Sequence, residues 1–399
     1  MILRLNPENN FWYIDLMRLL FVADGRSPIA QNWIRYFAES GVETYLASTW
    51  PCSPDLRVDG LEIIPVAFSG NVQEGQRKTR GSGGTIGLRS AIRHWLGPLT
   101  IRSASARLRR VVEKVKPDLV HAMRIPYEGM LAADAYTGVP LMVSVWGNDF
   151  TLHAASNGLM RHYTMWTMQV ADALHADCLR DIRLGKEWGF DPLRPALVIP
   201  GNGGVRTDVF YPAAEQADKP IVINPRGFRT YVRNDTFFQA VPRVLAKRPE
   251  ARFVCVAMAG EPQALKWIQQ LNIAHAVELL PAIPHVQMGE VFRRGQIIVS
   301  ASIHDGTPNT LLEGMACGCL PVAGDLESIR EWIRPGKNGL LADATNPESL
   351  ANAILEGLDN KDLRRQAAGM NQKIILERAE YAHCMATAER FYERIVSTQ

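Results

Sequence analysis

The sequence predicts an α/β protein built from two domains, each organised as a doubly wound parallel sheet. Its 399 residues exceed what one ordinary hydrophobic core serves, and 47% of them are apolar against 21% charged, which indicates a globular chain. Short apolar runs alternate with amphipathic stretches twice along the sequence. Such alternation of strands and helices is typical of parallel sheets covered by helices.

The first alternation begins at Met17, and residues 1–16 lack its pattern, so we expect an N-terminal extension followed by a domain over residues 17–204. Ser27 is a good helix N-cap, Pro28 suits the first turn, and Gly41 is expected to end that helix. The expected strands of this domain are Leu19–Asp24, Val42–Thr49, Leu61–Ala67, Leu119–Met123, Leu141–Trp146 and Ala196–Pro200.

A turn-rich segment at Pro200–Val205 marks a break, and the second alternation follows it as a domain over residues 205–374. Its expected strands are Ile221–Asn224, Phe253–Ala257, Val277–Leu280, Ile297–Ser300, Leu320–Ala323 and Gly339–Leu341. Residues 375–399 remain as a C-terminal helical segment, with Tyr381–Ile395 as the expected helix.

The segment from Ser302 to Ala323 carries the clearest chemistry. Asp305 and Glu313 flank a turn at Gly306 and the start of a helix, whose first backbone N–H groups lack intrahelical partners and attract phosphate. These N–H groups belong to Asn309, Thr310 and Leu311. Two carboxylates around a phosphate-sized positive pocket fit a sugar nucleotide. The alternative from the residues alone is an ordinary strand–loop–helix unit with two surface acids.

This segment resembles the signature of retaining glycosyltransferases of the GT-B fold, family 4. An acid, seven residues and a Glu are followed by a small-residue helix and a strand start, here Gly318–Val322, and the first acid is Asp305 where the family usually has Glu. The resemblance implies two Rossmann-like domains facing across a cleft, with the last helix crossing back to the first domain. It also implies transfer of a sugar from a nucleotide-diphosphate sugar to a saccharide or lipid-linked acceptor.

The resemblance assigns roles to further residues. Arg226 takes the position of a diphosphate-binding Arg, and Arg233 is favoured for the second cation with Arg229 close behind. With the amides of residues 309–311, these cations would neutralise the leaving diphosphate, while Asp305 would hold the sugar hydroxyls and Glu313 the ribose. Surface arginines in a loop are the alternative.

Two residues of the first domain also match family segments. His121 corresponds to a histidine that helps hold the donor sugar, although a structural histidine fits the sequence equally well. Asp149, in Val145–Asp149, is expected to shape its loop rather than to take part in chemistry. The glycine cluster Gly81–Gly87 does not follow a strand, so we interpret it as a mobile loop and not as a dinucleotide site.

The positive charge is concentrated in residues 77–116, which hold eleven Lys or Arg and one acid, Glu113, a net of +10. Trp95 and Leu96 are interleaved with basic residues. Two interpretations stay open: a surface for anionic lipid or a phosphorylated acceptor, or a solvated face. No motif for nucleic acid accompanies the charge.

The remaining signals concern cofactors, location and rival functions. The sequence has no metal-binding Asp-x-Asp, so we expect a metal-independent enzyme in which the nucleotide sugar is the co-substrate. Without a signal peptide or a run of about 20 apolar residues, the expected location is the cytoplasm, with peripheral attachment to the inner membrane face as a further option that the basic segment leaves open. The family resemblance implies a role in cell-envelope polysaccharide synthesis. The rivals are a sugar-nucleotide epimerase on the same fold and a non-catalytic nucleotide-sugar-binding protein.

Overall fold

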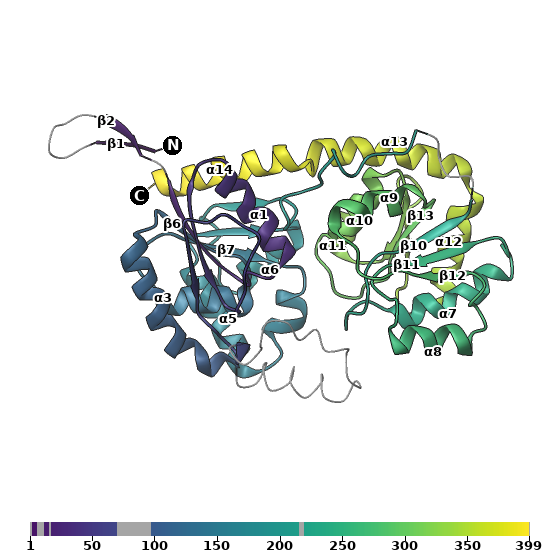
Figure 1. The fold of residues 1–399 in the computed structure, drawn as a ribbon, viewed down its shortest axis with the longest axis horizontal. Coiled ribbons are helices and arrows are strands. Elements are labelled where there is room, and N and C mark those ends of the chain that lie inside the picture. Colours follow the sequence, from purple (N-terminus) through teal and green to yellow (C-terminus); the bar gives the residue numbers. More distant parts are fainter. Residues whose placement is uncertain (1, 6–11, 16, 70–96, 215–218, 399) are drawn as a thin grey trace. The chain divides into compact units, whose positions relative to one another are not determined.

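The computed structural model describes residues 2–5, 12–15, 17–69, 97–214 and 219–398. It divides into two compact units, of which the first comprises Met1–Gly203 and Met385–Gln399 and the second Gly204–Cys384. Each unit contains a parallel sheet with helices between most successive strands, which confirms the predicted fold class (Figure 1). The second boundary falls at Cys384, ten residues later than the sequence placed the end of the second domain.

The sheet of the first unit has seven parallel strands in the order β5-β4-β3-β6-β7-β8-β9. The chain begins this sheet in the middle, moves to one edge and then returns to the other side of β3, so a topological switch point lies between β3 and β6. The strands are β3 (Arg18–Ala23), β4 (Glu43–Ser48), β5 (Gly60–Ile63), β6 (Leu119–Ala122), β7 (Leu141–Val145), β8 (Ala173–Ala176) and β9 (Ala196–Val198).

The first helix of this unit begins and ends at the residues that the sequence predicts. The side chain of Ser27 accepts the N–H of Ala30 at the start of α1, and Gly41 has a positive φ just beyond its end, as expected. The helices are α1 (Pro28–Glu39), α3 (Ile101–Val115), α4 (Met130–Ala135), α5 (Gly158–Val170) and α6 (Leu179–Glu187), with short turns η2 (Gly97–Thr100), η3 (Ile125–Gly129) and η4 (Asp149–Ala154).

The first residues form more structure than the sequence suggested. Strands β1 (Ile2–Leu5) and β2 (Trp12–Asp15) pair antiparallel as a two-stranded sheet that is separate from the seven-stranded one. The expectation that residues 1–16 lie outside the main alternation is compatible with this separation, but the pairing itself was not predicted.

The sheet of the second unit has six parallel strands in the order β12-β11-β10-β13-β14-β15. Here β10 and β13 are direct neighbours although more than seventy residues separate them in sequence. The strands are β10 (Ile221–Asn224), β11 (Arg252–Cys255), β12 (Val277–Leu279), β13 (Ile297–Ser300), β14 (Leu320–Gly324) and β15 (Leu340–Ala342).

Two apolar clusters cover this second sheet. One includes residues of α7 (Asn234–Leu245), α8 (Pro262–Gln270) and α12 (Pro347–Asp359). The other includes residues of α9 (Met288–Arg293), α10 (Asn309–Ala316) and α13 (Lys361–Arg378). The short elements η5 (His285–Gln287) and α11 (Glu327–Arg330) complete the unit. Helices in two groups on a parallel sheet confirm the doubly wound arrangement.

The last helix, α14 (Tyr381–Ser397), begins at the expected residue and runs two residues beyond the expected end. Its part from Met385 onward belongs to the first unit, where Tyr392 is fully buried. The ring of Tyr392 stacks on Phe37 of α1 with centroids 4.7 Å apart. Helix α14 is therefore packed on α1 by aromatic side chains.

Candidate functional site

Two loops of the second unit meet at the carboxyl ends of β10 and β13. The N–H of Arg233 donates to Ala301 O at 2.8 Å, and the N–H of Ile303 donates to Tyr231 O at 3.0 Å. Val232 and Ser302 form an isolated antiparallel bridge between the same loops. Because β10 and β13 are adjacent, the loop after each strand is held against the other.

This contact brings Arg226 to Asp305. The guanidinium of Arg226 donates to the carboxylate of Asp305 and to Ser302 Oγ at 3.1 Å. Both side chains are largely buried, with exposed fractions of 11% and 12%. Two residues that the sequence placed in one site by resemblance thus form an ion pair that is shielded from solvent.

Glu313 lies one turn into α10 and is buried, at 2% exposed. Its Oε2 atom has no hydrogen-bond partner among the described residues, and the same is true of Asn309 Oδ1 and Thr310 Oγ1. Residues 309 and 310 precede Glu313 by four and three positions, so these groups share one face of the helix. Buried polar atoms without partners are uncommon in folded proteins and indicate a place where a polar ligand would complete the bonding.

The backbone at the start of α10 corrects one detail of the sequence interpretation. The N–H of Leu311 donates to Pro308 O at 2.9 Å, so it does not point outward as expected. The N–H groups of Asn309 and Thr310 have no partner in the part of the chain that the structure describes. Two amides rather than three are therefore available for an anion, and Gly306 is a buried residue of the preceding turn.

His285 is a site residue that the sequence interpretation missed. Its Nε2 lies 2.7 Å from Glu313 Oε1, and its ring packs against Phe210 with centroids 5.0 Å apart. The hydrogen bond to Glu313 raises the pKa of His285 above 6.5, against the opposite effect of burial. No motif includes this histidine, because it sits in a short turn whose position depends on tertiary packing.

The other arginines of the loop after β10 behave differently from Arg226. Arg233 is paired with Asp235 through two hydrogen bonds, of 2.8 and 2.6 Å. Arg229 is exposed and has no ion pair with any described residue. The guanidinium that the sequence favoured as second cation therefore already has a carboxylate partner, whereas its alternative has none.

In the first unit, His121 is fully buried, and both of its ring nitrogens are occupied. Nδ1 lies 2.5 Å from Tyr392 Oη, and Nε2 lies 2.7 Å from Ser144 Oγ. Burial and the nearby His175 lower the pKa of His121 well below 6.5. This environment favours the structural alternative for His121 over a role in holding a donor sugar.

Asp149 organises its loop, as the sequence suggested. Its carboxylate accepts the N–H groups of Trp146 (3.1 Å) and Ile125 (3.3 Å) and pairs with Arg124 at 2.8 Å. Of the basic segment 77–116, residues 77–96 lie outside the described residues, as does the glycine cluster 81–87. The described remainder includes α3, where Arg102, Arg110 and Lys114 are exposed.

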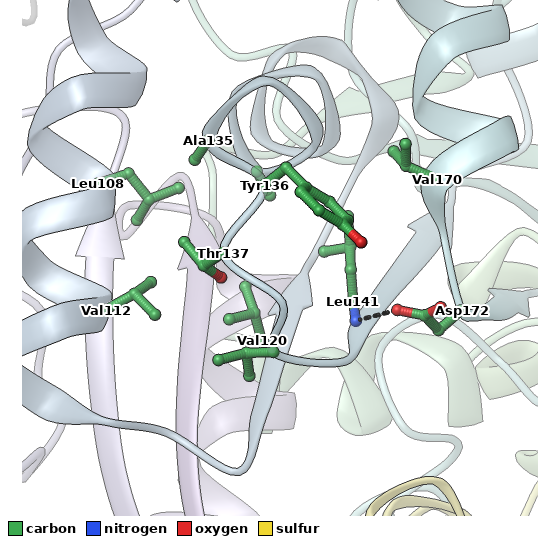
Figure 2. Close-up of a pocket in the computed structure, with 11 residues that line it drawn as sticks. Leu108, Val112, Val120, Ala135, Tyr136, Thr137, Leu141, Val170 and Asp172 are labelled. Carbon is green, nitrogen blue, oxygen red and sulfur yellow. Dashed lines mark hydrogen bonds between the residues drawn. The ribbon is translucent and has the colours of Figure 1, made fainter. Parts of the chain in front are cut away.

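One pocket of the first unit is too small to hold a substrate. Figure 2 shows Tyr136 and Thr137 beside side chains of α3, with Leu141 N hydrogen-bonded to Asp172 at 3.0 Å. Its volume is about 20 Å³, which is room for about one water.

Two family models match successive parts of the chain. Residues 206–373 match the family model described as glycosyl transferases group 1, and residues 25–201 match the glycosyl transferase 4-like domain. A D-inositol 3-phosphate glycosyltransferase of Thermobispora bispora is 27% identical over 49% of this chain and 50% of its own. An alpha-maltose-1-phosphate synthase of Mycolicibacterium smegmatis is 25% identical over 57% of this chain and 64% of its own. The chain thus spans about half the length of the curated relatives it matches.

Solved structures share the fold. A sucrose-phosphate synthase from Thermosynechococcus elongatus superposes with a TM-score of 0.75 at 15% identity, covering 96% of this chain and all of that one. HepE from Anabaena, solved in complex with UDP-glucose, gives 0.71 at 14% identity, covering 96% of this chain and all of its own. Among the described residues, no helix has the length and apolar character that crossing a bilayer requires.

Proposed function

The chain belongs to the group 1 glycosyl transferases, and on this premise we propose that it moves a sugar from a nucleotide-diphosphate sugar to a saccharide or lipid-linked acceptor with retention of anomeric configuration. The observation that carries the proposal is the group of polar atoms in the second unit. Arg226, held by Asp305, supplies the buried positive charge, and the face of α10 supplies two amides and the Glu313 carboxylate. HepE, which shares the fold, was solved with UDP-glucose.

In this proposal the leaving diphosphate is bound by Arg226 and the amides of Asn309 and Thr310. A cation and helix N–H groups that are fixed before the reaction stabilise negative charge as it develops on the departing phosphate. The second cation is Arg229 or Arg233, of which Arg233 would first have to leave Asp235.

Glu313 is proposed to bind the ribose hydroxyls through Oε2, since Oε1 is already engaged by His285. Asp305 is proposed to bind hydroxyls of the donor sugar. A carboxylate accepts hydrogen bonds at both oxygens, so its pairing with Arg226 at Oδ2 is compatible with this second role. Because the described carboxylates of the second unit are assigned to binding, same-face substitution assisted by the leaving phosphate is the proposed route, without a metal.

Two observations bear on the chemical class of the acceptor. Two of the relatives carry phosphorylated compounds in their names, the cyclic polyol inositol 3-phosphate and the sugar maltose 1-phosphate. The exposed basic residues of α3 also suit an acidic acceptor or an anionic membrane surface on which a lipid-linked acceptor resides.

A donor screen tests the proposal. The chain is titrated with UDP-, GDP- and ADP-glucose by calorimetry, and each donor that binds is incubated with and without acceptor while anomeric proton signals are followed by NMR. Transfer that yields the same anomer as the donor, and that persists in EDTA, supports the proposal. Formation of an epimeric nucleotide sugar without acceptor would support the epimerase instead, and binding without turnover would support a binding protein.

A further inference from the structure

The first unit contains a cavity of about 170 Å³, roughly the size of one sugar ring. Its lining residues follow β3, β4, β6 and β7, and include Asp24, Trp50, Arg124, Glu128 and Trp146. This position is the carboxyl edge of the sheet on either side of the switch point between β3 and β6. In open parallel sheets, ligands bind in the crevice at such a point.

Glu128 is the distinctive group of the cavity. It is 5% exposed and accepts a hydrogen bond from Thr49 Oγ1 at 2.6 Å, and it forms no ion pair with any described residue. Burial raises the pKa of Glu128, and this effect outweighs the lowering by the hydrogen bond from Thr49 and by the charge of Arg124. A buried carboxyl without a cation partner disfavours an additional negative charge nearby and remains able to hydrogen-bond a hydroxyl.

The two described arginines beside this cavity each have a carboxylate partner. Arg26 pairs with Asp24 through bonds of 2.9 and 2.8 Å, and Arg124 pairs with Asp149 at 2.8 Å and with Asn148 at 3.0 Å. Among the described residues that line the cavity, Glu128 is therefore the carboxyl without an ion-pair partner. An anion that entered would meet arginines whose charge is already balanced by a carboxylate.

The cavity also presents aromatic surface. Trp50 and Trp146 both line it, with the guanidinium of Arg26 lying 3.7 Å from the Trp50 ring centre and that of Arg124 5.3 Å from the Trp146 ring centre. Both distances lie within the range of cation–π attraction, which favours these positions of the two rings. Apolar ring surface combined with carboxyl acceptors suits the mixed apolar and hydroxylated surface of a sugar.

We propose that this cavity binds one uncharged sugar ring of the acceptor, with hydroxyls on Glu128 and Asp24 and apolar C–H surface against the tryptophans, and that it discriminates against phosphorylated sugars. This inference rests on the proposed function, because it takes the bound sugar to be the acceptor, and it specifies that the acceptor ring held here carries no phosphate. Glu128 is the residue that sets the discrimination.

The test compares matched ligands on the full chain. Methyl α-glycosides of glucose, mannose, galactose and N-acetylglucosamine are titrated by saturation-transfer NMR in parallel with the 6-phosphates of the same four sugars. At least one uncharged glycoside should bind at least tenfold more tightly than its phosphate. Glu128→Ala should weaken that glycoside at least tenfold, and Glu113→Ala, an exposed acid of the same unit, should leave it unchanged.

A second variant, Glu128→Gln, tests the inference even if Glu128→Ala fails to fold. Glu128→Gln keeps the shape and hydrogen-bonding groups but removes the carboxyl charge, so it should retain glycoside binding and reduce the preference over the phosphate at least fivefold. Tighter binding of the phosphates to the wild type, no binding of any glycoside, or unchanged affinities in a folded Glu128→Ala variant would each overturn the inference.

The same samples are titrated with UDP-glucose, GDP-glucose and ADP-glucose. Donor binding without the glycoside preference would overturn this inference and leave the proposed function standing. The glycoside preference without binding of any donor would leave this inference standing and would overturn the proposed function.

Discussion

The phenol oxygen of Tyr392 on α14 lies 2.5 Å from Nδ1 of His121 on β6. Trp33 Nε1 donates to the same phenol oxygen at 2.8 Å, so the phenol O–H is left to donate to His121. The Nε2 proton of His121 then points to Ser144, whose hydroxyl donates to His175 Nδ1 at 2.8 Å, and His175 Nε2 donates to Ile199 O at 3.0 Å. The Trp33 indole at one end of this hydrogen-bond series can only donate, and the Ile199 carbonyl at the other end can only accept. These two ends fix the donor-to-acceptor direction of every hydrogen bond in the series.

Removing the phenol oxygen should destabilise the first unit. Tyr392→Phe leaves Trp33 Nε1 and His121 Nδ1 buried without partners, and we expect a loss of about 2–4 kcal/mol of unfolding free energy in urea titrations. Tyr136→Phe is the matched control, because Tyr136 is 70% exposed and its loss of a hydroxyl should cost little. A Tyr392→Phe variant as stable as the wild type would show that this hydrogen-bond series does not stabilise the first unit.

Lowering the pH should reduce the free energy of unfolding of the first unit through the buried His175. Burial lowers the pKa of His175 to about 4, so the unfolded chain binds more protons than the folded one between pH 6.5 and 4. The stabilisation is therefore complete well above pH 6.5 and declines as the pH falls towards 4, with about 2 kcal/mol lost by pH 5. The test is urea titration at pH 6.5 and at pH 5. Between these pH values His175→Gln should lose less unfolding free energy than the wild type, whereas the control His162→Gln, at an exposed position, should lose as much as the wild type.

Much of the fold could be predicted from the sequence because its signals are local. Each expected strand is present, and the cap at Ser27 and the stop at Gly41 are where the residues placed them. Strand runs depend on apolar neighbours in sequence, and caps depend on one or two residues. The β1–β2 pair escaped prediction, because antiparallel pairing of two short strands has no comparably strong local pattern.

The candidate site was predictable only where topology is implied by a motif. Asp305 and Arg226 each follow a strand, and the adjacency of β10 and β13 brings them together. The contact of His285 with Glu313 and the pairing of Arg233 with Asp235 depend on side-chain directions in loops, which spacing does not encode.

Loss of Arg226 should abolish most turnover. If its guanidinium stabilises the leaving diphosphate, Arg226→Ala should lower kcat at least roughly a hundredfold, as removal of a major transition-state contact does. Arg243→Ala removes an exposed arginine of the same unit and should leave kcat unchanged. Near-normal turnover in a folded Arg226→Ala variant, verified by circular dichroism, would exclude this role.

The pKa of His285 should depend on Glu313. The hydrogen bond to Glu313 raises this pKa, whereas burial and the charge of Arg206 lower it. A raised pKa means that the contribution to stability is present below pH 6.5 and is lost as the pH rises through the folded value. An NMR titration should give a pKa above 6.5 in the wild type and below 6.5 in Glu313→Gln. Equal values in the two proteins would contradict the contact.

The basic helix α3 should bind anionic bilayers. Arg102, Arg110 and Lys114 are exposed on it, and each basic residue near an anionic surface contributes about 1 kcal/mol, screened by salt. We expect cosedimentation with vesicles that contain phosphatidylglycerol, poor binding to phosphatidylcholine alone, and release by added salt.

Changing these three residues to Gln should reduce the partition coefficient at least tenfold while leaving donor affinity unchanged, because the proposed donor residues belong to the second unit. The matched control changes Arg243, Lys247 and Lys266, which are exposed in the second unit, and alters net charge by the same amount. A loss of binding in both triple variants would indicate a general charge effect. Equal sedimentation with neutral and anionic vesicles, or with neither, would leave α3 as a solvated face.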